Sequence, residues 1–239
     1  MRSFVIARRE WRSAFDTPVA YVLLAFLPAV LAAFFFVVGS FFDEQTASLR
    51  RFFENLPMLM VLAAPATTMR LWAEERRSGT EELLMTYPFR VRELVLGKFL
   101  GALGLLALAL TFTLGVPFTV AFLGDLDWGP VIGGYLGALL LGAASVAVGL
   151  FFSALTRNQI VAWLLGVTVL LAFNLIGIAA TATAVPPWLS ALFLDLDFGA
   201  RFASIARGVL DLQDAAFFGG VAAVFLCWNG LVIEARRWS

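Results

Sequence analysis

Six long apolar stretches dominate this chain and restrict its possible folds more than any other feature. They cover residues 19–42, 56–72, 99–123, 130–155, 159–180 and 215–233. Each is close to the ~20 residues that a helix needs to cross a bilayer. Of the 239 residues, 61% are hydrophobic and 14% charged, whereas soluble domains average about 45–50% apolar and about 25% charged residues. We therefore predict an all-α polytopic membrane protein with six transmembrane helices, and the length leaves residues 1–239 as a single transmembrane domain.

Several kinds of chemistry are excluded by residues that the chain lacks. It contains no histidine, which excludes histidine metal ligands and histidine general bases. Lys98 follows Gly97 but precedes Phe99, so this pair is not part of a phosphate-binding loop of the GxxxxGK[ST] type. We expect no catalytic residue, bound cofactor or metal site in this chain. The formal net charge is zero, which implies no general attraction to nucleic acid.

Within the bounds given above, the interiors of the six apolar stretches contain no charged residue. Buried ionisable groups usually mark proton relays and ion pathways, so their absence argues against an ion-driven secondary transporter. The polar residues deep in these stretches are expected mainly to bond to helix backbone or to a neighbouring helix; they are Thr111, Thr113, Thr168 and Asn174. Asn174 is the best candidate for lining a path through the membrane, followed by Thr168.

The N-terminal segment, residues 2–16, has the pattern of an amphipathic helix. Its apolar face is formed by Phe4, Ala7, Trp11 and Phe15, and its polar face by Arg2, Arg9, Arg12 and Ser13. Such a helix lies in the plane of the membrane interface. Thr17 and Pro18 have the residue types that open a helix, as N-cap and first helical residue.

The most charged stretch, residues 74–90, separates the second and third apolar stretches. Ser78 followed by Glu81 has the form of a capping box, which satisfies free N–H groups at a helix start. Leu83, Leu84 and Tyr87 then form a short apolar face, and Pro88 stops the helix. Two interpretations stay open: a helix that docks onto another protein, and an ordinary solvated loop.

Basic residues predict the orientation, because they concentrate on the cytoplasmic side. One side would hold thirteen: Arg2, Arg8, Arg9, Arg12, Arg70, Arg76, Arg77, Arg90, Arg92, Lys98, Arg157, Arg236 and Arg237. The other would hold four: Arg50, Arg51, Arg201 and Arg207. Both termini and residues 74–90 are therefore expected in the cytoplasm.

The longest connection on the opposite side covers residues 181–214. Its apolar residues are spaced for one helical face: Phe198, Phe202, Ile205, Val209 and Leu212. Asp197 and Arg201, and Arg207 and Asp211, stand four residues apart and could form ion pairs. We expect an amphipathic helix at the outer leaflet that caps the bundle, in preference to a substrate gate.

Small residues recur at helical spacing in two stretches. They are Gly134, Ala138 and Gly142 in the fourth, and Gly97 and Gly101 before and within the third. Small residues allow helices to approach closely in lipid. The spacing fits a contact inside the bundle and a dimer seam equally well.

Three parts of the sequence resemble one family of membrane proteins. The motif Ala73-Glu74-Glu75-Arg76-Arg77-x-Gly79-Thr80-x-Glu82-Leu83-Leu84, with Pro88 and Gly97-Lys98-Phe99-Leu100 after it, looks like the first cytoplasmic loop of ABC-2 type transporter permeases. Residues 6–21 and 198–238 are similar to the small gliding-motility-type permeases of that family. A related group serves maturation of nitrous-oxide reductase.

This resemblance implies a six-span permease of the ABC-2, or type V exporter-like, fold. Residues 2–16 would be the elbow helix, with Arg8, Arg9, Trp11, Arg12 and Phe15. The coupling loop would dock on the ATPase through Glu74, Glu75, Gly79, Thr80, Glu81, Glu82, Leu83, Leu84, Tyr87 and Pro88. Extracytoplasmic helices before the last span would contain Arg201, Arg207 and Asp211.

The same resemblance implies partners and a location. Two copies of a separate ABC ATP-binding subunit would hold ATP and Mg²⁺. A second permease subunit would complete the pore, either as a homodimer or as a heterodimer with a partner that has a large extracytoplasmic domain. The complex would lie in the lipid of a bacterial cytoplasmic membrane.

Three functions are compatible with these features. The first is the membrane half of an ATP-driven exporter. The second is an ATP-coupled module that assembles or exerts force on an envelope machine without a transported substrate. The third and least favoured is a channel or carrier without an ATPase, because it predicts buried ionisable residues or an internal repeat.

Overall fold

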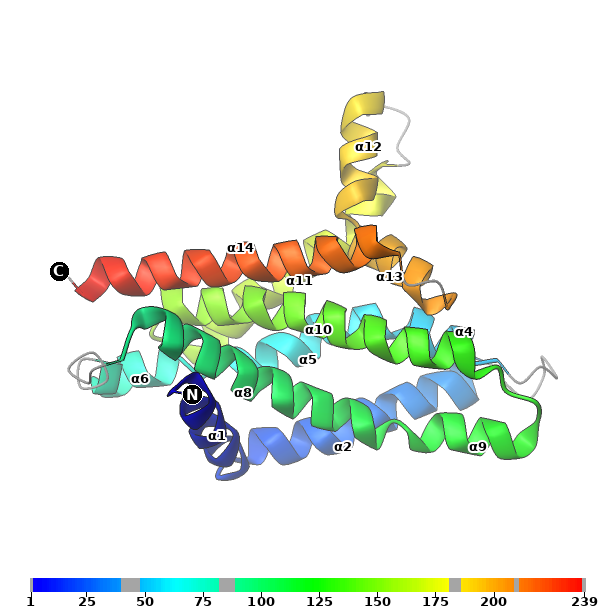
Figure 1. Cartoon of the computed structure of the whole chain (residues 1–239), viewed down its shortest axis with the longest axis horizontal. Helices are drawn as coiled ribbons and strands as arrows, with labels where there is room; N and C mark the ends of the chain where they lie inside the picture. The colour runs from blue at the N-terminus through cyan, green and yellow to red at the C-terminus, as the bar shows by residue number, and fades with distance from the viewer. Residues whose placement is uncertain (1, 40–47, 82–88, 181–185, 209–210, 238–239) are drawn as a thin grey trace.

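A computed structural model of the chain describes residues 2–39, 48–81, 89–180, 186–208 and 211–237 (Figure 1). Throughout these ranges the regular structure is helical, and the helices are joined by short turns. Within them, six helical stretches are long and apolar enough to cross a membrane. The predictions of an all-α fold and of six apolar spans are therefore confirmed.

The six stretches have the following bounds. The first combines α2 (Pro18–Ala33) with the π-helical turn η1 (Phe34–Val38), the second combines α5 (Leu56–Thr68) with α6 (Ala73–Ser78), and the third combines α8 (Val91–Phe112) with α9 (Gly115–Leu123). The others are α10 (Trp128–Leu155), α11 (Gln159–Ala180) and α14 (Leu212–Arg237). Shorter helices are α1 (Arg2–Phe15), α4 (Arg50–Glu54), α12 (Pro187–Leu196) and α13 (Phe198–Ala206).

Helix α10 runs through the middle of the bundle, where it packs against α5, α8, α11, α13 and α14 (Figure 1). Its small residues make this central position possible. A Cβ atom on Gly134 would lie 2.5 Å from the ring of Phe53, and one on Gly142 would lie 2.5 Å from Leu106. Ala138 is fully buried. These small residues therefore serve contacts inside the bundle, which resolves the choice that the spacing alone left open.

Helix α1 crosses the first half of α8 at the end of the bundle that also holds the C-terminus (Figure 1). A Cβ atom on Gly97 would approach Ile6 to 2.6 Å, and one on Gly101 would approach Glu10 to 2.9 Å. The expected apolar face is divided: Ala7 is buried beside Ile6, whereas Phe4 and Trp11 are exposed. Close helix contact at two glycines decides which face of α1 turns inward.

The second and third stretches extend well beyond their predicted bounds at their charged ends. Helix α8 begins at Val91, where the backbone N–H of Arg90 donates to Glu93 Oε2 over 3.0 Å. The second stretch continues through α6 to Ser78. As a result Lys98, predicted to precede the third stretch, lies near the start of α8 and is fully buried in the protein.

The connection before α14 contains two helices, as the family resemblance implies, whereas the spacing of apolar residues alone had suggested one amphipathic helix. These helices are α12 and α13, and α12 packs against α11 while it projects from the rest of the bundle (Figure 1). Phe198, Phe202 and Ile205 are buried on α13 as a common face, but Leu212 belongs to α14 and is 82% exposed. Gly208, with φ +90°, breaks the helix after α13. Val209 lies outside the described residues.

Candidate functional site

A buried cationic residue joins three helices at the end of the bundle that holds α6, called here the α6 end. Lys98 Nζ of α8 lies 3.1 Å from Glu10 Oε1 of α1 and 2.7 Å from Glu75 Oε1 of α6. It also donates to the carbonyl oxygen of Leu71 over 2.9 Å and lies 4.8 Å from the ring centroid of Trp72. We call these five residues the Lys98 cluster. Its three charged groups bring together residues up to 88 positions apart in sequence.

Burial makes the Lys98 cluster a strong positional constraint. The Lys98 side chain is fully buried, and those of Glu10 and Glu75 are 12% and 14% exposed. A charge removed from water is tolerated when it is paired and hydrogen-bonded, and is costly otherwise. Glu75 Oε2 and Trp72 Nε1 are buried and have no hydrogen-bond partner in the described part of the chain. Movement of α6 relative to α1 or α8 would therefore expose or unpair charges.

Ser153 of α10 attaches the same segment to the central helix. Its hydroxyl accepts hydrogen bonds from the backbone N–H groups of Trp72 (3.1 Å) and Ala73 (3.3 Å) and donates to the carbonyl of Met69 (3.0 Å). These groups belong to the junction between α5 and α6, where the helical bonding pattern is interrupted. Ser153 was not predicted as a site residue, because nothing local distinguishes it from other small residues of an apolar helix.

The start of the predicted docking segment is turned toward the bundle. Glu81 Oε2 lies 3.5 Å from Arg76 Nε, and its Oε1 lies 3.8 Å from an Nη of Arg236 in α14. Both arginines also donate to the carbonyl of Ala154, over 3.2 and 2.6 Å. Glu81 is thus 14% exposed and links α6 to α10 and α14.

The predicted capping box at Ser78 is not formed. Ser78 is the last residue of α6, and its hydroxyl donates to the carbonyl of Glu74 over 2.9 Å. Gly79 follows with φ +73°, the left-handed conformation that commonly ends a helix. The side chain of Glu81 is engaged by Arg76, so it does not reach back to the Ser78 N–H.

The other predicted docking and elbow residues fall into three groups. Those exposed at the α6 end are Glu74, Gly79, Thr80, Arg8, Arg9, Trp11 and Arg12. Phe15 is half-buried, and Glu75 and Glu81 point inward as described above. Lying outside the described residues are Glu82, Leu83, Leu84, Tyr87 and Pro88.

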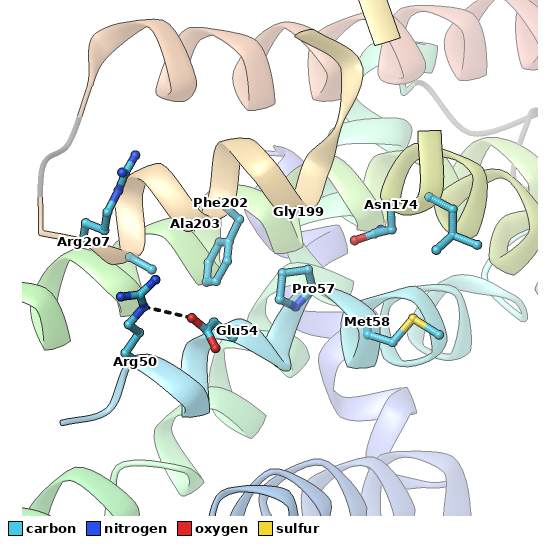
Figure 2. Close-up of a pocket in the computed structure, with 11 residues that line it drawn as sticks. Arg50, Glu54, Pro57, Met58, Asn174, Gly199, Phe202, Ala203 and Arg207 are labelled. Carbon is cyan, nitrogen blue, oxygen red and sulfur yellow. Dashed lines mark hydrogen bonds and ion pairs between the residues drawn. The ribbon is translucent and has the colours of Figure 1, made fainter. Parts of the chain in front are cut away.

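A cavity of about 510 Å³ lies at the opposite end of the bundle, called here the α13 end (Figure 2). Asn174 of α11 forms part of its wall and donates from Nδ2 to the carbonyl of Leu170 over 2.9 Å. Thr168 does not line it; this residue is exposed and donates to the carbonyl of Leu164. The remaining lining residues are Arg50, Glu54, Pro57, Met58, Leu175, Gly199, Phe202, Ala203, Ala206 and Arg207.

Arg201 joins the outer helices beside this cavity, with partners other than those predicted. It pairs with Asp195 of α12 (3.2 Å) and Asp214 of α14 (3.0 Å) and lies 4.6 Å from the ring centroid of Phe217. The expected pair with Asp197 is absent, because that carboxylate caps α13 at the N–H of Gly199.

The second predicted pair is also not formed. Asp211 Oδ1 accepts the backbone N–H of Gln213 at the start of α14, over 3.1 Å. Arg207 is exposed and forms no ion pair within the described ranges. The carboxylates of Asp197 and Asp211 each accept a hydrogen bond from a backbone N–H group at the start of a helix. Aspartate is well suited to this capping role.

Large apolar side chains are exposed along the sides of the bundle. They include Tyr21 and Phe26 on α2, Phe122 on α9, Ile160 and Ile178 on α11, and Leu231 on α14. Soluble monomers rarely expose continuous apolar surface on this scale. Among the described residues, no three Asp, Glu or Cys side chains gather to form a possible metal site.

The sequence of this chain matches the model of one known protein family. The family described as "ABC-2 family transporter protein" matches residues 52–195, more than half of the chain. The chain belongs to the ABC-2 transporter family. No curated protein shows a significant sequence match to it.

As an ABC-2 protein with six apolar helical stretches, the chain is an integral membrane protein and a permease component of an ABC transporter. Permeases of this family generally work with an ABC ATP-binding subunit. The matched region contains Glu75 and Lys98 but not Glu10. The Lys98 cluster therefore joins the ABC-2 region of the chain to a helix outside that region.

Proposed function

We propose that this ABC-2 permease converts ATP hydrolysis by a separate ABC ATP-binding subunit into rearrangement of its own transmembrane helices, and that this rearrangement exports a substrate or does work on the cell envelope. The Lys98 cluster carries the proposal. It joins α6, which directly precedes the predicted coupling helix, to α1 and α8 through buried ion pairs. Because buried ion pairs join α6 to the other two helices, a displacement of α6 by a partner protein moves those helices as well.

The proposed sequence of events is mechanical. Closure of the ATP-binding subunits moves the coupling helix, residues 79–87, in its groove on the ATPase. Through Glu75 and Lys98 the displacement passes from α6 to α8, and Glu10 carries it to α1. Ser153 passes it to α10. ATP and Mg²⁺ are held by the ATP-binding subunit, and this chain performs no covalent chemistry.

The proposal includes an orientation and an assembly. The α6 end faces the cytoplasm of a bacterium and the α13 end lies outside the cytoplasmic membrane, because thirteen basic residues are assigned to the α6 side and four to the other. Two ATP-binding subunits serve a pair of permeases. The pair is a homodimer or, as in gliding-motility-type systems and the related nitrous-oxide reductase maturation group, includes a partner with a large extracytoplasmic domain.

Copurification from native membranes tests this function directly. We expect the tagged chain to bring down an ABC ATP-binding subunit in mild detergent, and Leu84→Arg to abolish that association while membrane insertion persists. Leu84 is chosen for this substitution because it belongs to the predicted apolar docking face. Leu212→Arg is the matched control, since this residue of α14 is 82% exposed at the α13 end.

Either of two results would contradict the proposal. A chain that comes down alone in repeated trials would favour a self-contained channel or scaffold. An ATPase recovered at wild-type yield with Leu84→Arg would place the docking face elsewhere. A copurifying partner with a large extracytoplasmic domain would favour work on an envelope machine over export.

A further inference from the structure

We propose that the cavity at the α13 end binds the anionic headgroup of a membrane lipid, with the first part of its apolar chain on the cavity floor. This inference concerns the resting permease, and it does not depend on an ATP-binding subunit. It rests on three features of the cavity: an apolar floor open at the side, a net positive end, and a depth that matches the headgroup region of a bilayer.

The floor of the cavity is apolar and reaches the surface of the bundle that faces lipid. Pro57 and Phe202 are buried in it, while Met58 and Leu175 are 52% and 44% exposed. These two exposed residues lie on α5 and α11, so the cavity opens between those helices. Its volume of about 510 Å³ falls in the range of roughly 300–1,000 Å³ that is typical of small-molecule sites. An apolar chain can therefore enter from the bilayer without crossing water.

One end of the cavity carries net positive charge. Arg50 and Arg207 lie at the same end (Figure 2), and Glu54 is the acidic residue of the lining. Two positive charges and one negative charge leave a net charge of +1. Arg50 donates to Glu54 through Nε over 2.9 Å, and its terminal guanidinium nitrogens are unused among the described residues. Guanidinium groups bind phosphate and carboxylate through paired hydrogen bonds, so this end suits an anionic headgroup.

The depth of the cavity matches the position of a lipid headgroup. Pro57 and Met58 stand in the first turn of α5, which begins at Leu56. Asn174 precedes the end of α11, at Ala180, by six residues, or about 9 Å along the helix. The interfacial layer on each side of a bilayer is roughly 5–7 Å thick. With the end of α11 placed at the outer edge of this layer, Asn174 and the apolar floor lie just below the headgroups, and the arginines are assigned to headgroup level.

Asn174 adds a polar contact at the boundary between these two levels. Its Nδ2 is engaged by the carbonyl of Leu170, and its Oδ1 points toward the cavity (Figure 2). A free amide oxygen accepts a hydrogen bond from a hydroxyl group. The site therefore fits a headgroup with an anionic phosphate and a hydroxyl, such as phosphatidylglycerol, better than a choline headgroup.

Native mass spectrometry of the detergent-purified full chain tests the proposal. The probes are dioleoyl phosphatidylglycerol, dioleoyl phosphatidylcholine and inorganic phosphate, each titrated separately. We expect one phosphatidylglycerol to bind about tenfold more tightly than phosphatidylcholine. Both lipids carry the phosphate, but only phosphatidylcholine brings a choline cation toward Arg50 and Arg207, and only phosphatidylglycerol has hydroxyl groups that can donate to Asn174 Oδ1. Inorganic phosphate at millimolar concentration should not displace it, because phosphate gains nothing from the apolar floor.

Three variants locate the binding. Arg207→Gln should reduce the preference to about twofold or less, whereas Arg157→Gln, which removes a positive charge from an exposed residue at the α6 end, should leave it unchanged. Ala203→Trp fills the cavity from an exposed position on α13 and should weaken binding of both lipids. Thermal unfolding of Arg207→Gln should match wild type, because the residue is exposed.

Three outcomes would overturn the proposal. Unchanged binding in both Arg207→Gln and Ala203→Trp would place any bound lipid elsewhere. An equal loss in Arg157→Gln would show general charge attraction. Displacement of the lipid by inorganic phosphate would show that the cavity takes a free anion. Because no ATPase is present, none of these results bears on the proposed coupling function.

Discussion

At the scale of single residues, Lys98 shows how a buried charge can serve a permease. Its ammonium group is fully buried yet has two carboxylates and a carbonyl oxygen within 3.1 Å. The ring of Trp72 covers it at 4.8 Å and adds a cation–π attraction. Replacing such a network with apolar groups is often tolerated, whereas removing one member leaves the others buried and uncompensated.

We predict that Lys98→Met lowers the free energy of unfolding by about 3–5 kcal/mol, because it leaves the Glu10 and Glu75 carboxylates buried without a cation. The triple variant Lys98→Met, Glu10→Gln, Glu75→Gln should recover most of this loss, since it removes all three charges. Thermal unfolding in one detergent, followed by circular dichroism, measures both effects.

Arg157→Gln is the control for this series, because Arg157 is an exposed positive residue at the same end of the bundle. It should unfold at the wild-type temperature. A single variant Lys98→Met as stable as wild type, or a triple variant less stable than the single one, would contradict the role given to the Lys98 cluster.

At the scale of helices, stability depends on which small residues face a neighbour. On α10, side chains of neighbouring helices occupy the space beside two glycines: Phe53 packs against Gly134, and Leu106 packs against Gly142. On α14, by contrast, Gly219 and Gly220 have no atom within 4 Å of a Cβ built on them. Packed glycines thus occur in α10 and open glycines in α14, and only the packed ones fix a crossing point.

We predict that Gly134→Ala destabilises the bundle by about 1–3 kcal/mol, because its Cβ would lie 2.5 Å from the ring of Phe53 and overpacking has costs of this size. Gly219→Ala should be neutral or stabilising by up to about 1 kcal/mol, the gain in helix propensity. Thermal unfolding of both variants in the same detergent gives the comparison. Equal effects at the two positions would contradict the internal role of Gly134.

At the scale of the whole molecule, charge is distributed unequally between the two ends. Helix α1, α6, the start of α8 and the end of α14 carry most of the basic residues, and the N- and C-termini lie at this same end (Figure 1). The α13 end holds Arg50, Arg51, Arg201 and Arg207. The fold thus gathers onto one end the basic residues that the sequence distributes over several segments.

We predict that a membrane-impermeant maleimide labels Gln213→Cys in intact cells but labels Ser78→Cys only after permeabilisation. Both residues are exposed, one at each end of the bundle. Each change is made in a Cys227→Ser background, since Cys227 is exposed on α14. The bias of thirteen basic residues to four sets the direction. Labelling of Ser78→Cys in intact cells would reverse the proposed orientation.

Much of the fold could be predicted from the sequence, because the length of an apolar stretch is a local property. Helix α11 has the predicted bounds, 159–180, and α1 differs from its predicted range by one residue. Helix α8 began earlier than predicted because the sequence analysis treated charged residues as lying outside a span. Asn174 was predicted to line a path through the membrane, and the structure places it in a cavity wall; its neighbours there, Arg50, Pro57 and Arg207, were not predicted as lining residues.

The sequence by itself determined that this chain forms six apolar helical stretches and carries the ABC-2 motif, since both depend on residues close together in the chain. Tertiary structure alone decided which charged residues pair: Lys98 with Glu10 and Glu75, Arg201 with Asp195 and Asp214, and Glu81 with Arg76 and Arg236. Most of these partners lie on different helices, and the pair of Lys98 with Glu10 depends on the close contact of α1 with α8 at Gly97 and Gly101. No periodicity along the chain records such a contact, because it arises only when the helices pack.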